Sequence, residues 1–338
     1  MKKIVSFIKK LNPHIVLPCL IILALVGSCI FLAKWAKGVD SEYNRDEVED
    51  GYEIEVLDRV YYMYPDMLGE HIPNETKRIL CFGNAPFSDD RDSENNLCNL
   101  IAKETGAEVI NLSIPDSYMA MTSTDGYITD PFDYYTFYWL MCFATFEDKA
   151  PLLKAFEFAT GASEIGNSVV DYLCKIDLNT VDSIVLMYDA ADYLDGSLKE
   201  TPEDLSNPAT FCGNMYAGIN LIQEAYPHIQ IIIMSPTYAY AIDEDGNYES
   251  SDIIKVNGDS LSAYAITQLN LCQVAEVTFI DHIYGTIHAD NADDYLSDNV
   301  RLNLKGRKAV AERFSNIYKA TWDRYYNVLN SEKSAPPA

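Results

Sequence analysis

Basic residues are scarce in this sequence. It contains 25 lysines and arginines against 51 aspartates and glutamates, so its formal net charge is −26 at pH 7. Six of the lysines lie in the first 37 residues, and the chain beyond them carries 19 basic and 51 acidic side chains. Such an excess of negative charge opposes binding to nucleic acid, to anionic lipid and to unaided polyanionic wall polymers. The simplest role of this charge is solubility.

Motifs that would indicate a metal, redox or nucleotide site are also absent. The eight cysteines include no C-x-x-C pair, which argues against a zinc or dithiol site. The sequence has no glycine-rich phosphate loop and no internal repeat. Several cysteines stand in apolar contexts such as residues 79–82, so we predict buried free thiols, although disulfides cannot be paired from sequence. We predict neither a cofactor nor a metal.

A single long apolar run is present near the N-terminus. Residues 15–33 are almost wholly apolar, and at the helical rise they would span about 28 Å, close to the hydrocarbon thickness of a bilayer. Residues 1–14 are rich in lysine, which predicts a cytoplasmic N-terminus, although Lys34 and Lys37 weaken the asymmetry. We predict a single-pass transmembrane helix in the cell membrane, with an extracytoplasmic soluble domain.

Two other interpretations of this run compete with an anchor. A cleaved secretory signal would need small residues at a clear cleavage site and a shorter apolar core. Residues 26–29 resemble a degenerate lipoprotein cleavage box, so lipidation of Cys29 stays open. Residues 30–33 continue the apolar run past that cysteine, which favours an uncleaved anchor.

The chain beyond the apolar run divides into three parts. Residues 34–74 predict a stalk or linker: residues 38–51 are polar and acidic, and residues 52–74 have the mixed apolar and charged pattern of a helix that leads into the domain. Residues 75–328 alternate short apolar runs with helical patterns, and residues 329–338 read as a disordered tail. This alternation predicts a three-layer α/β domain with a five-stranded, mostly parallel sheet. The predicted strands are residues 78–83, 107–112, 182–188, 229–234 and 277–280; the predicted helices are residues 93–105, 131–160, 208–226, 257–273 and 304–326.

Ligands on such sheets bind at the carboxyl ends of the strands. Four segments at or near these ends resemble, in order and in strand context, the motifs of the SGNH/GDSL hydrolases. They are residues 82–88, 111–116, 189–193 and 298–306. The resemblance extends over residues 78–318 and implies a flavodoxin-like fold and an esterase or acetylhydrolase ancestry. In that family the motifs supply a nucleophilic serine, a backbone and a side-chain oxyanion donor, and an Asp-x-x-His pair.

The resemblance also implies that the standard catalytic groups are missing. Ala85 stands at the nucleophile position and has no oxygen with which to attack an ester. Arg301 stands at the position of the histidine base, and a guanidinium stays protonated and cannot accept a proton. Ala191 replaces the oxyanion asparagine, a loss that costs about 100- to 1000-fold in rate. We therefore predict a divergent member that is catalytically inactive.

Some groups could retain a role. Asp298 is the remnant of the Asp-x-x-His motif and is predicted to pair with Arg301, while Ser113 keeps a backbone N–H at the oxyanion position. Ser88 is a speculative replacement nucleophile, with His282 or His288 as a source of imidazole; a serine before two aspartates is more often a helix cap. The predicted pocket consists of Asn84, Ala85, Ala191, Asp192, Arg301 and Asn303.

Three further patterns have a structural alternative that we favour. Residues 243–249 alternate oxygen-bearing side chains as calcium loops do, but their glycine is misplaced for an EF-hand, and a hairpin turn is predicted. Aspartates cluster over residues 290–298, where a solvated loop is favoured over a cation site. The aromatic residues 132–146 could line a sugar-binding surface, but a helix packed on the sheet is favoured.

These observations leave three hypotheses of function. The first is a binding or accessory protein in cell-envelope glycan synthesis or acylation, whose partner is an envelope glycan or a protein of the acylation machinery. The second is an active ester hydrolase or O-acyltransferase on surface glycans that uses a non-standard nucleophile. The third is a structural surface protein with a closed cleft. Flavin binding is a weaker competitor, because residues 84–86 do not form a phosphate loop.

Overall fold

The computed structural model describes residues 56–64, 68, 71–123, 127–243 and 245–334. The predicted cytoplasmic residues 1–14 and transmembrane residues 15–33 lie outside the described residues. Within the described ranges, no helix has the length and apolar character needed to cross a membrane.

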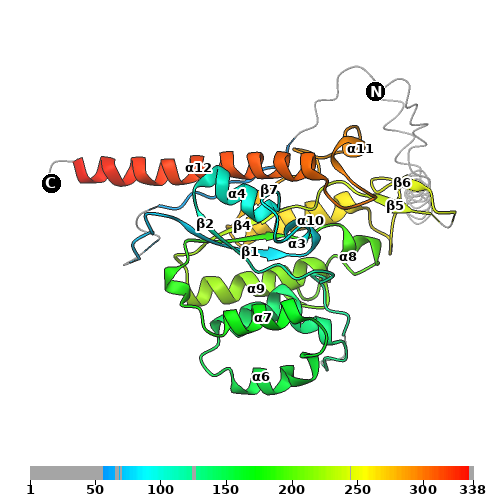
Figure 1. The fold of residues 1–338 in the computed structure, drawn as a ribbon, viewed down its shortest axis with the longest axis horizontal. Helices are drawn as coiled ribbons and strands as arrows, with labels where there is room; N and C mark the ends of the chain where they lie inside the picture. The colour runs from blue at the N-terminus through cyan, green and yellow to red at the C-terminus, as the bar shows by residue number, and fades with distance from the viewer. Residues whose placement is uncertain (1–55, 65–67, 69–70, 124–126, 244, 335–338) are drawn as a thin grey trace, which may run out of the picture. The chain divides into compact units, whose positions relative to one another are not determined.

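The centre of the domain is a five-stranded parallel sheet (Figure 1), which confirms the predicted strands. The strand order is β2-β1-β3-β4-β7, and all four pairings are parallel. The three central strands are almost wholly buried, as expected for parallel strands that carry helices on both faces. The strands are β1 (Arg78–Gly83), β2 (Glu108–Asn111), β3 (Ser183–Met187), β4 (Gln230–Met234) and β7 (Thr278–Ile280).

Helices cover both faces of this sheet. On one face α4 (Leu97–Thr105) packs against α12 (Leu304–Ser334), and on the other α5 (Phe137–Thr145) packs against α9 (Phe211–Ala225) (Figure 1). The aromatic residues of α5 form a packed helix as predicted, since six of its nine side chains are buried. The single helix predicted over residues 131–160 is wrong, because the chain there forms η3 (Pro131–Tyr135), α5, α6 (Ala150–Phe156) and η4 (Glu157–Ala159). The remaining longer helices are α7 (Glu164–Leu173) and α10 (Leu261–Val274).

Two predictions about the ends of the domain are wrong. Helix α12 continues to Ser334, so residues 329–334 are helical rather than a disordered tail, and Leu329 still packs against the core. Residues 56–64 form no helix; Arg59 exchanges two backbone hydrogen bonds with Phe279 of β7, at 2.9 and 2.8 Å. This segment therefore covers an edge of the sheet that would otherwise be open to pairing with another chain.

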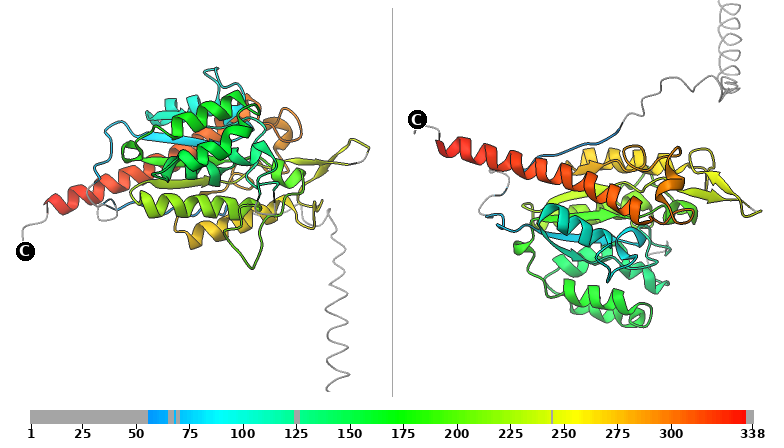
Figure 2. Two further views of the ribbon diagram at one scale, coloured as in Figure 1. Left: turned by 90° about the horizontal axis from the view of Figure 1, so that it is seen from below. Right: turned by 45° about the horizontal axis from the view of Figure 1, so that its top comes forward.

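The predicted hairpin is confirmed. Strands β5 (Tyr240–Ile242) and β6 (Tyr248–Ser250) pair antiparallel and extend as an arm from the domain (Figure 2). The carboxylate of Asp243 accepts the backbone N–H groups of Asp245 and Asn247, at 2.9 and 2.7 Å, and so caps the turn. The six cysteines in the described part of the chain are free, and five of them are buried.

Candidate functional site

The first strand ends in a turn that fixes the position expected for a nucleophile. Gly83 has φ +153°, and a Cβ there would lie 1.8 Å from the carbonyl oxygen of Met187, so the close approach of β1 and β3 requires glycine. The chain then enters a single helical turn, α3 (Ala85–Ser88). Ala85 opens this turn and is buried, so a methyl group stands where a hydroxyl would be needed.

Asn84 and Asp189 join the carboxyl ends of β1 and β3. The amide nitrogen of Asn84 donates to Asp189 Oδ1 at 2.8 Å, and the backbone N–H of Asp189 donates to Asn84 Oδ1 at 2.9 Å. Asp189 Oδ1 also accepts the N–H of Ala191 at 3.0 Å. Burial raises the pKa of Asp189, and the hydrogen bonds from Ala191 and Asn84 act against that rise. This pair joins the two strand ends. Asn84, Ala85 and Ala191, which were predicted as pocket residues, do not line the polar pocket described below.

Arg301 connects the loops after β1 and β2 with the loop before α12. Its guanidinium lies 3.2 Å from Asp89 Oδ1 and 3.8 Å from Asp116 Oδ1. The predicted ion pair of Arg301 with Asp298 is wrong. The Asp298 carboxylate accepts the backbone N–H groups of Val300 and Arg301 instead, at 2.9 and 2.7 Å, and serves to form the turn.

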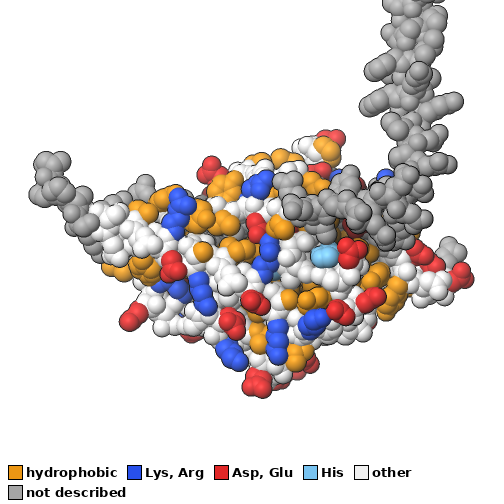
Figure 3. All heavy atoms as spheres, turned by 90° about the horizontal axis from the view of Figure 1, so that it is seen from above, with side chains coloured by type: hydrophobic (Ala, Val, Ile, Leu, Met, Phe, Trp, Pro, Cys, Tyr) orange, Lys and Arg blue, Asp and Glu red, His pale blue; other side chains and the backbone are white. Residues whose placement is uncertain are grey.

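A polar pocket of about 320 Å³ lies at this position. Arg307, which is almost buried, pairs with Asp90 at 2.6 Å beside the Arg301–Asp89 pair. Burial raises the pKa of Asp89 and outweighs the lowering by Arg301 and Arg307. Figure 3 shows that acidic and basic side chains are interspersed over the face that carries α12. The pocket is lined by Asp89, Asp90, Ser297, Arg301, Leu302, Asn303 and Arg307.

Asn303, one of the pocket residues, has a clear structural role. Its Oδ1 accepts the N–H of Gly306 at 3.0 Å, and its amide donates to the carbonyl of Asp294 at 2.9 Å. Asn303 therefore caps α12. Gly306 permits this, because a Cβ there would lie 2.4 Å from the carbonyl oxygen of Tyr295.

The predicted backbone oxyanion donor, the Ser113 N–H, is engaged within the protein. The backbone N–H of Ser113 donates to Asn111 Oδ1 at 3.1 Å, and its hydroxyl donates to the same oxygen at 2.6 Å. Ser113 is fully buried, and Arg91 donates to its hydroxyl and carbonyl oxygens. The Ser113 N–H is therefore not directed at a substrate, and Ala191 has no side-chain donor at the position of the oxyanion asparagine.

Asp192 lies apart from the pocket. Its two carboxylate oxygens accept the backbone N–H groups of Met119 and Ala120, each at 2.9 Å, and its side chain is 1% exposed. Burial raises the pKa of Asp192 to about 7, although both of these hydrogen bonds act to lower it. Asp192 therefore holds the loop after β2 rather than contacting a ligand.

The structure does not assemble a displaced catalytic triad. Ser88 is buried in α3 and donates its N–H to the carbonyl of Asn84 at 2.9 Å. His282 bonds to Thr286 through Nδ1 at 2.8 Å, and His288 lies 3.7 Å from Asp290. In the described part of the chain, neither imidazole forms a hydrogen bond with Ser88.

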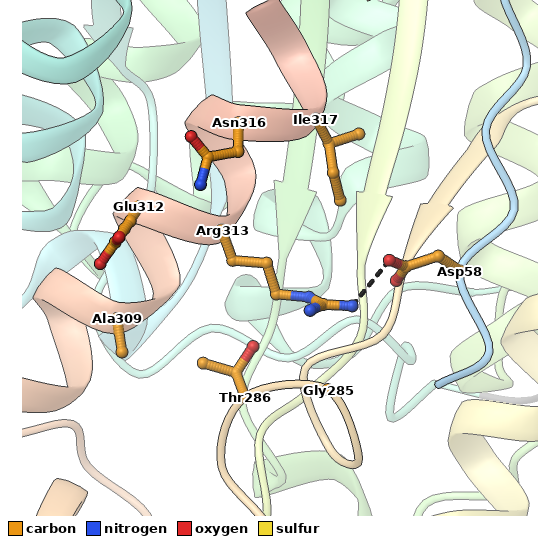
Figure 4. A pocket seen from close by; sticks show the side chains of 8 residues that line it. All are labelled: Asp58, Gly285, Thr286, Ala309, Glu312, Arg313, Asn316 and Ile317. Carbon is orange, nitrogen blue, oxygen red and sulfur yellow. Dashed lines mark hydrogen bonds and ion pairs between the residues drawn. The ribbon is translucent and has the colours of Figure 1, made fainter. Parts of the chain in front are cut away.

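A second polar pocket, of about 410 Å³, lies after β7 and was not predicted (Figure 4). Arg313 of α12 points across it toward Asp58, with 2.6 Å between Nη2 and Oδ2. Asp58 also accepts the N–H of Asp281 at 2.8 Å. A Cβ on Gly285 would lie 2.5 Å from Arg313 Nη2, so glycine lets the guanidinium lie against this loop. These contacts join the incoming chain, the loop after β7 and α12.

Three charged residues of the polar pocket were not predicted from the sequence, although they lie next to the recognised motifs. Asp89 and Asp90 come directly after α3, and Arg307 comes directly after Gly306. Their charge was visible in the sequence, but the pairing between segments more than 200 residues apart was not.

No protein-family model matches the chain, and no curated protein matches it. Solved structures with a similar fold include a possible lipase from Chitinophaga pinensis, 12% identical with a TM-score of 0.46, covering 72% of this chain and 98% of that one. The aryl esterase of M. smegmatis is 14% identical, with a TM-score of 0.45 and coverage of 73% and 100%. Est24, a carbohydrate acetylesterase from Sinorhizobium meliloti, is 11% identical, with a TM-score of 0.41 and coverage of 72% and 99%.

The strand order, together with the placement of the four motif segments at or near the carboxyl ends of the strands, defines the class of fold. The described domain has an SGNH/GDSL-type α/β fold, as the resemblance implied. At such low identities the similar structures concern the fold alone.

Proposed function

We propose that this protein is a catalytically inactive SGNH-type protein that binds a polar ligand in the pocket around Arg301. The observation that carries the proposal is the replacement of both reacting groups. A buried methyl group stands at the nucleophile position, and the guanidinium at the base position is held by Asp89 and Asp116. Ester hydrolysis through this pocket would need a nucleophile and a proton acceptor that these groups do not supply.

The chemistry of the pocket suits a ligand rich in hydroxyl groups. Carboxylates accept two hydrogen bonds and guanidinium groups donate several in a fixed plane, a combination that can bind neighbouring hydroxyls of a sugar. Arg301 and Asp89 are partly exposed, so their remaining donors and acceptors can reach a ligand. An envelope glycan is therefore the ligand class that we propose.

The proposed setting is the outer face of the cell membrane. Its support is the apolar run at residues 15–33, preceded by a lysine-rich segment. From there the protein would act beside glycan synthesis or acylation, presenting the glycan or contacting a protein of that machinery.

Binding and hydrolysis, measured on the full-length protein, test this proposal. Saturation-transfer NMR with acetylated and unacetylated oligosaccharides should detect binding that Asp89→Asn and Arg301→Gln each weaken. Release of acetate from the same sugars should not exceed that of an Asp298→Ala control. Turnover that disappears with Ser88→Ala would overturn the proposal in favour of an active hydrolase. A lack of binding to any glycan would overturn it in favour of a structural role.

A second experiment tests the loss of catalysis directly. Ala85→Ser with Arg301→His restores a hydroxyl and an imidazole at the two positions. We expect no esterase activity, because Asn111 still holds the Ser113 N–H and Ala191 supplies no side-chain oxyanion donor. Strong activity in this double variant would show that a functional oxyanion site persists.

A further inference from the structure

A separate pocket of about 430 Å³ lies between the edge strand β2 and helix α7. We propose that this pocket binds a monocarboxylate that bears an apolar chain, with Arg91 as the residue that binds the carboxylate. The proposal does not depend on the function assigned to the pocket around Arg301.

Arg91 is the first part of the argument. Its guanidinium donates to the carbonyl oxygen of Asn111 at 3.0 Å and to the hydroxyl of Ser113 at 2.9 Å, both neutral acceptors. Its Nε is buried and has no hydrogen-bond partner in the described part of the chain. Arg91 forms no ion pair with a described residue, whereas Arg307 and Arg313 each have a carboxylate at 2.6 Å.

Asp92 acts on Arg91 electrostatically but forms no ion pair with it, and a bound anion would lower the cost of burying this charge. Burial lowers the pKa of Arg91, but a guanidinium is not deprotonated in proteins at neutral pH. Nη2 is engaged with Ser113 and Nε is buried, so one N–H of Nη1 is the donor left for a ligand. The pocket thus offers a permanent cation with one unused donor, and hydrogen bonds between a guanidinium and a carboxylate are stronger than those between neutral groups.

The opposite wall of the pocket is apolar. Ile165, Val169 and Tyr172 recur at helical spacing on α7, and Ile110 faces them from β2. Ile110, Ile165 and Tyr172 are only partly buried, so a ligand can still contact them. A pocket with a cation at one side and an apolar wall at the other fits an amphipathic acid, and its volume suits a small molecule.

Two further features narrow the ligand class. Arg91 occupies the carbonyl oxygens of Asn111 and Ser113, which a docking peptide strand would need as acceptors. Glu164 also lines the pocket, and together with the acidic net charge it disfavours dianions such as phosphate. A monoanion with an alkyl or aryl chain remains the best match.

Calorimetric titration of the full-length protein with hexanoate, 1-hexanol and inorganic phosphate tests the proposal. We expect hexanoate to bind at least ten-fold more tightly than hexanol or phosphate. Lengthening the chain from butanoate to octanoate should strengthen binding about fourfold per methylene, as expected for about 0.8 kcal/mol per buried CH₂.

Variants locate the site. Arg91→Gln should weaken hexanoate binding at least ten-fold, and Arg91→Lys should restore part of it. Arg324→Gln is the matched control, because this arginine lies on α12 beside Tyr62 and Tyr64 and should leave binding unchanged. If Arg91→Gln does not fold, Ile165→Ser can be used instead. This variant keeps the cation and should reduce the affinity gained with each added methylene of the ligand. Equal binding of hexanol and hexanoate, or hexanoate affinity unaffected by both pocket variants, would overturn the proposal.

Discussion

Two arginines of α12, Arg307 and Arg313, form ion pairs of the same 2.6 Å length in regions that differ in construction. Around Arg307, the partly exposed groups Asp89 and Arg301 leave polar atoms free to contact a ligand. We call Asp89, Asp90, Arg301 and Arg307 the binding region. Around Arg313, the carboxylate of Asp58 is shared between the guanidinium and a backbone N–H. We call Asp58, His282, Gly285 and Arg313 the joining region.

The comparison shows that the same residue types serve different ends according to what surrounds them. In the joining region, Asp58 and Arg313 are both mostly buried and connect segments 255 residues apart. Breaking such a contact should cost stability. In the binding region, the side chains of Arg301 and Asp90 are 47% and 57% exposed and are screened by water, whereas Asp89 and Arg307 are no more exposed than the joining pair. Loss of an exposed charge such as Arg301 should therefore cost ligand affinity more than stability. The following predictions separate the two regions, from the largest expected effect to the smallest.

The joining region should make the protein sensitive to acid through His282. Burial and the nearby Arg313 lower the pKa of this histidine to about 3 from an ordinary 6.5. The folded state therefore binds fewer protons than the unfolded state, and stability present above pH 6.5 is lost as the pH falls toward 3. The shift corresponds to about 5 kcal/mol in the free energy of unfolding. In urea unfolding at pH 7, 5.5 and 4, the free energy of unfolding of His282→Gln should fall less on acidification than that of the wild type. Parallel curves would contradict this prediction.

Asp192, which lies outside both regions, should give the opposite dependence of stability on pH. Burial raises its pKa to about 7 from 3.8, so the folded state binds more protons than the unfolded state. Its contribution to stability is fully present below pH 3.8 and is lost as the pH rises through 7, by about 4 kcal/mol. Asp192→Asn should remove this loss between pH 4 and 8, while the exposed Asp171→Asn should not. The idea fails if both variants retain the wild-type pH profile.

Gly285 tests the packing of the joining region. An added Cβ would lie 2.5 Å from both Arg313 Nη2 and the carbonyl oxygen of Asp281, so the guanidinium or the loop must move. We expect Gly285→Ala to lower the free energy of unfolding by about 2–4 kcal/mol. Gly161→Ala is the matched control, because nothing lies within 4 Å of its added Cβ. Equal unfolding midpoints for the two variants in urea would show that the loop adapts without cost.

The sequence predicts best the parts of the fold that depend on local pattern. The strand over residues 78–83 has the predicted bounds, because a continuous apolar run followed by glycine specifies a buried strand and its end. The segment around Arg59 was predicted incorrectly because its partner, Phe279, is distant in the chain and pairs through backbone atoms alone. Helix α12 extends beyond its predicted end because Leu329 packs against the core, a contact that the local sequence does not show.

The candidate site also has features that the sequence predicts and features that it does not. The absence of the motif serine and histidine is a prediction from sequence, since Ala85 and Arg301 are identified by their place in the motifs. The partner of Arg301 could not be predicted, because Asp89 reaches it only when the loops meet in space. The Ser113 N–H looked available in the sequence, yet the side chain of Asn111 captures it through a local turn.

Arg301→Gln should give the smallest change in stability and the sharpest contrast between the regions. The Arg301 side chain is 47% exposed, and ion pairs of this kind contribute at most about 1 kcal/mol to stability. The variant should therefore unfold within about 1 kcal/mol of the wild type, yet bind oligosaccharide about ten-fold more weakly, because a guanidinium donates hydrogen bonds that glutamine cannot reproduce. Lys305→Gln is the matched control: it removes an exposed pair with Asp294 at the start of α12, outside the pocket lining. Urea unfolding and NMR titration of both variants decide the matter. A large loss of stability with Arg301→Gln would mean that this arginine joins loops as Arg313 does, and that the two regions serve the same purpose.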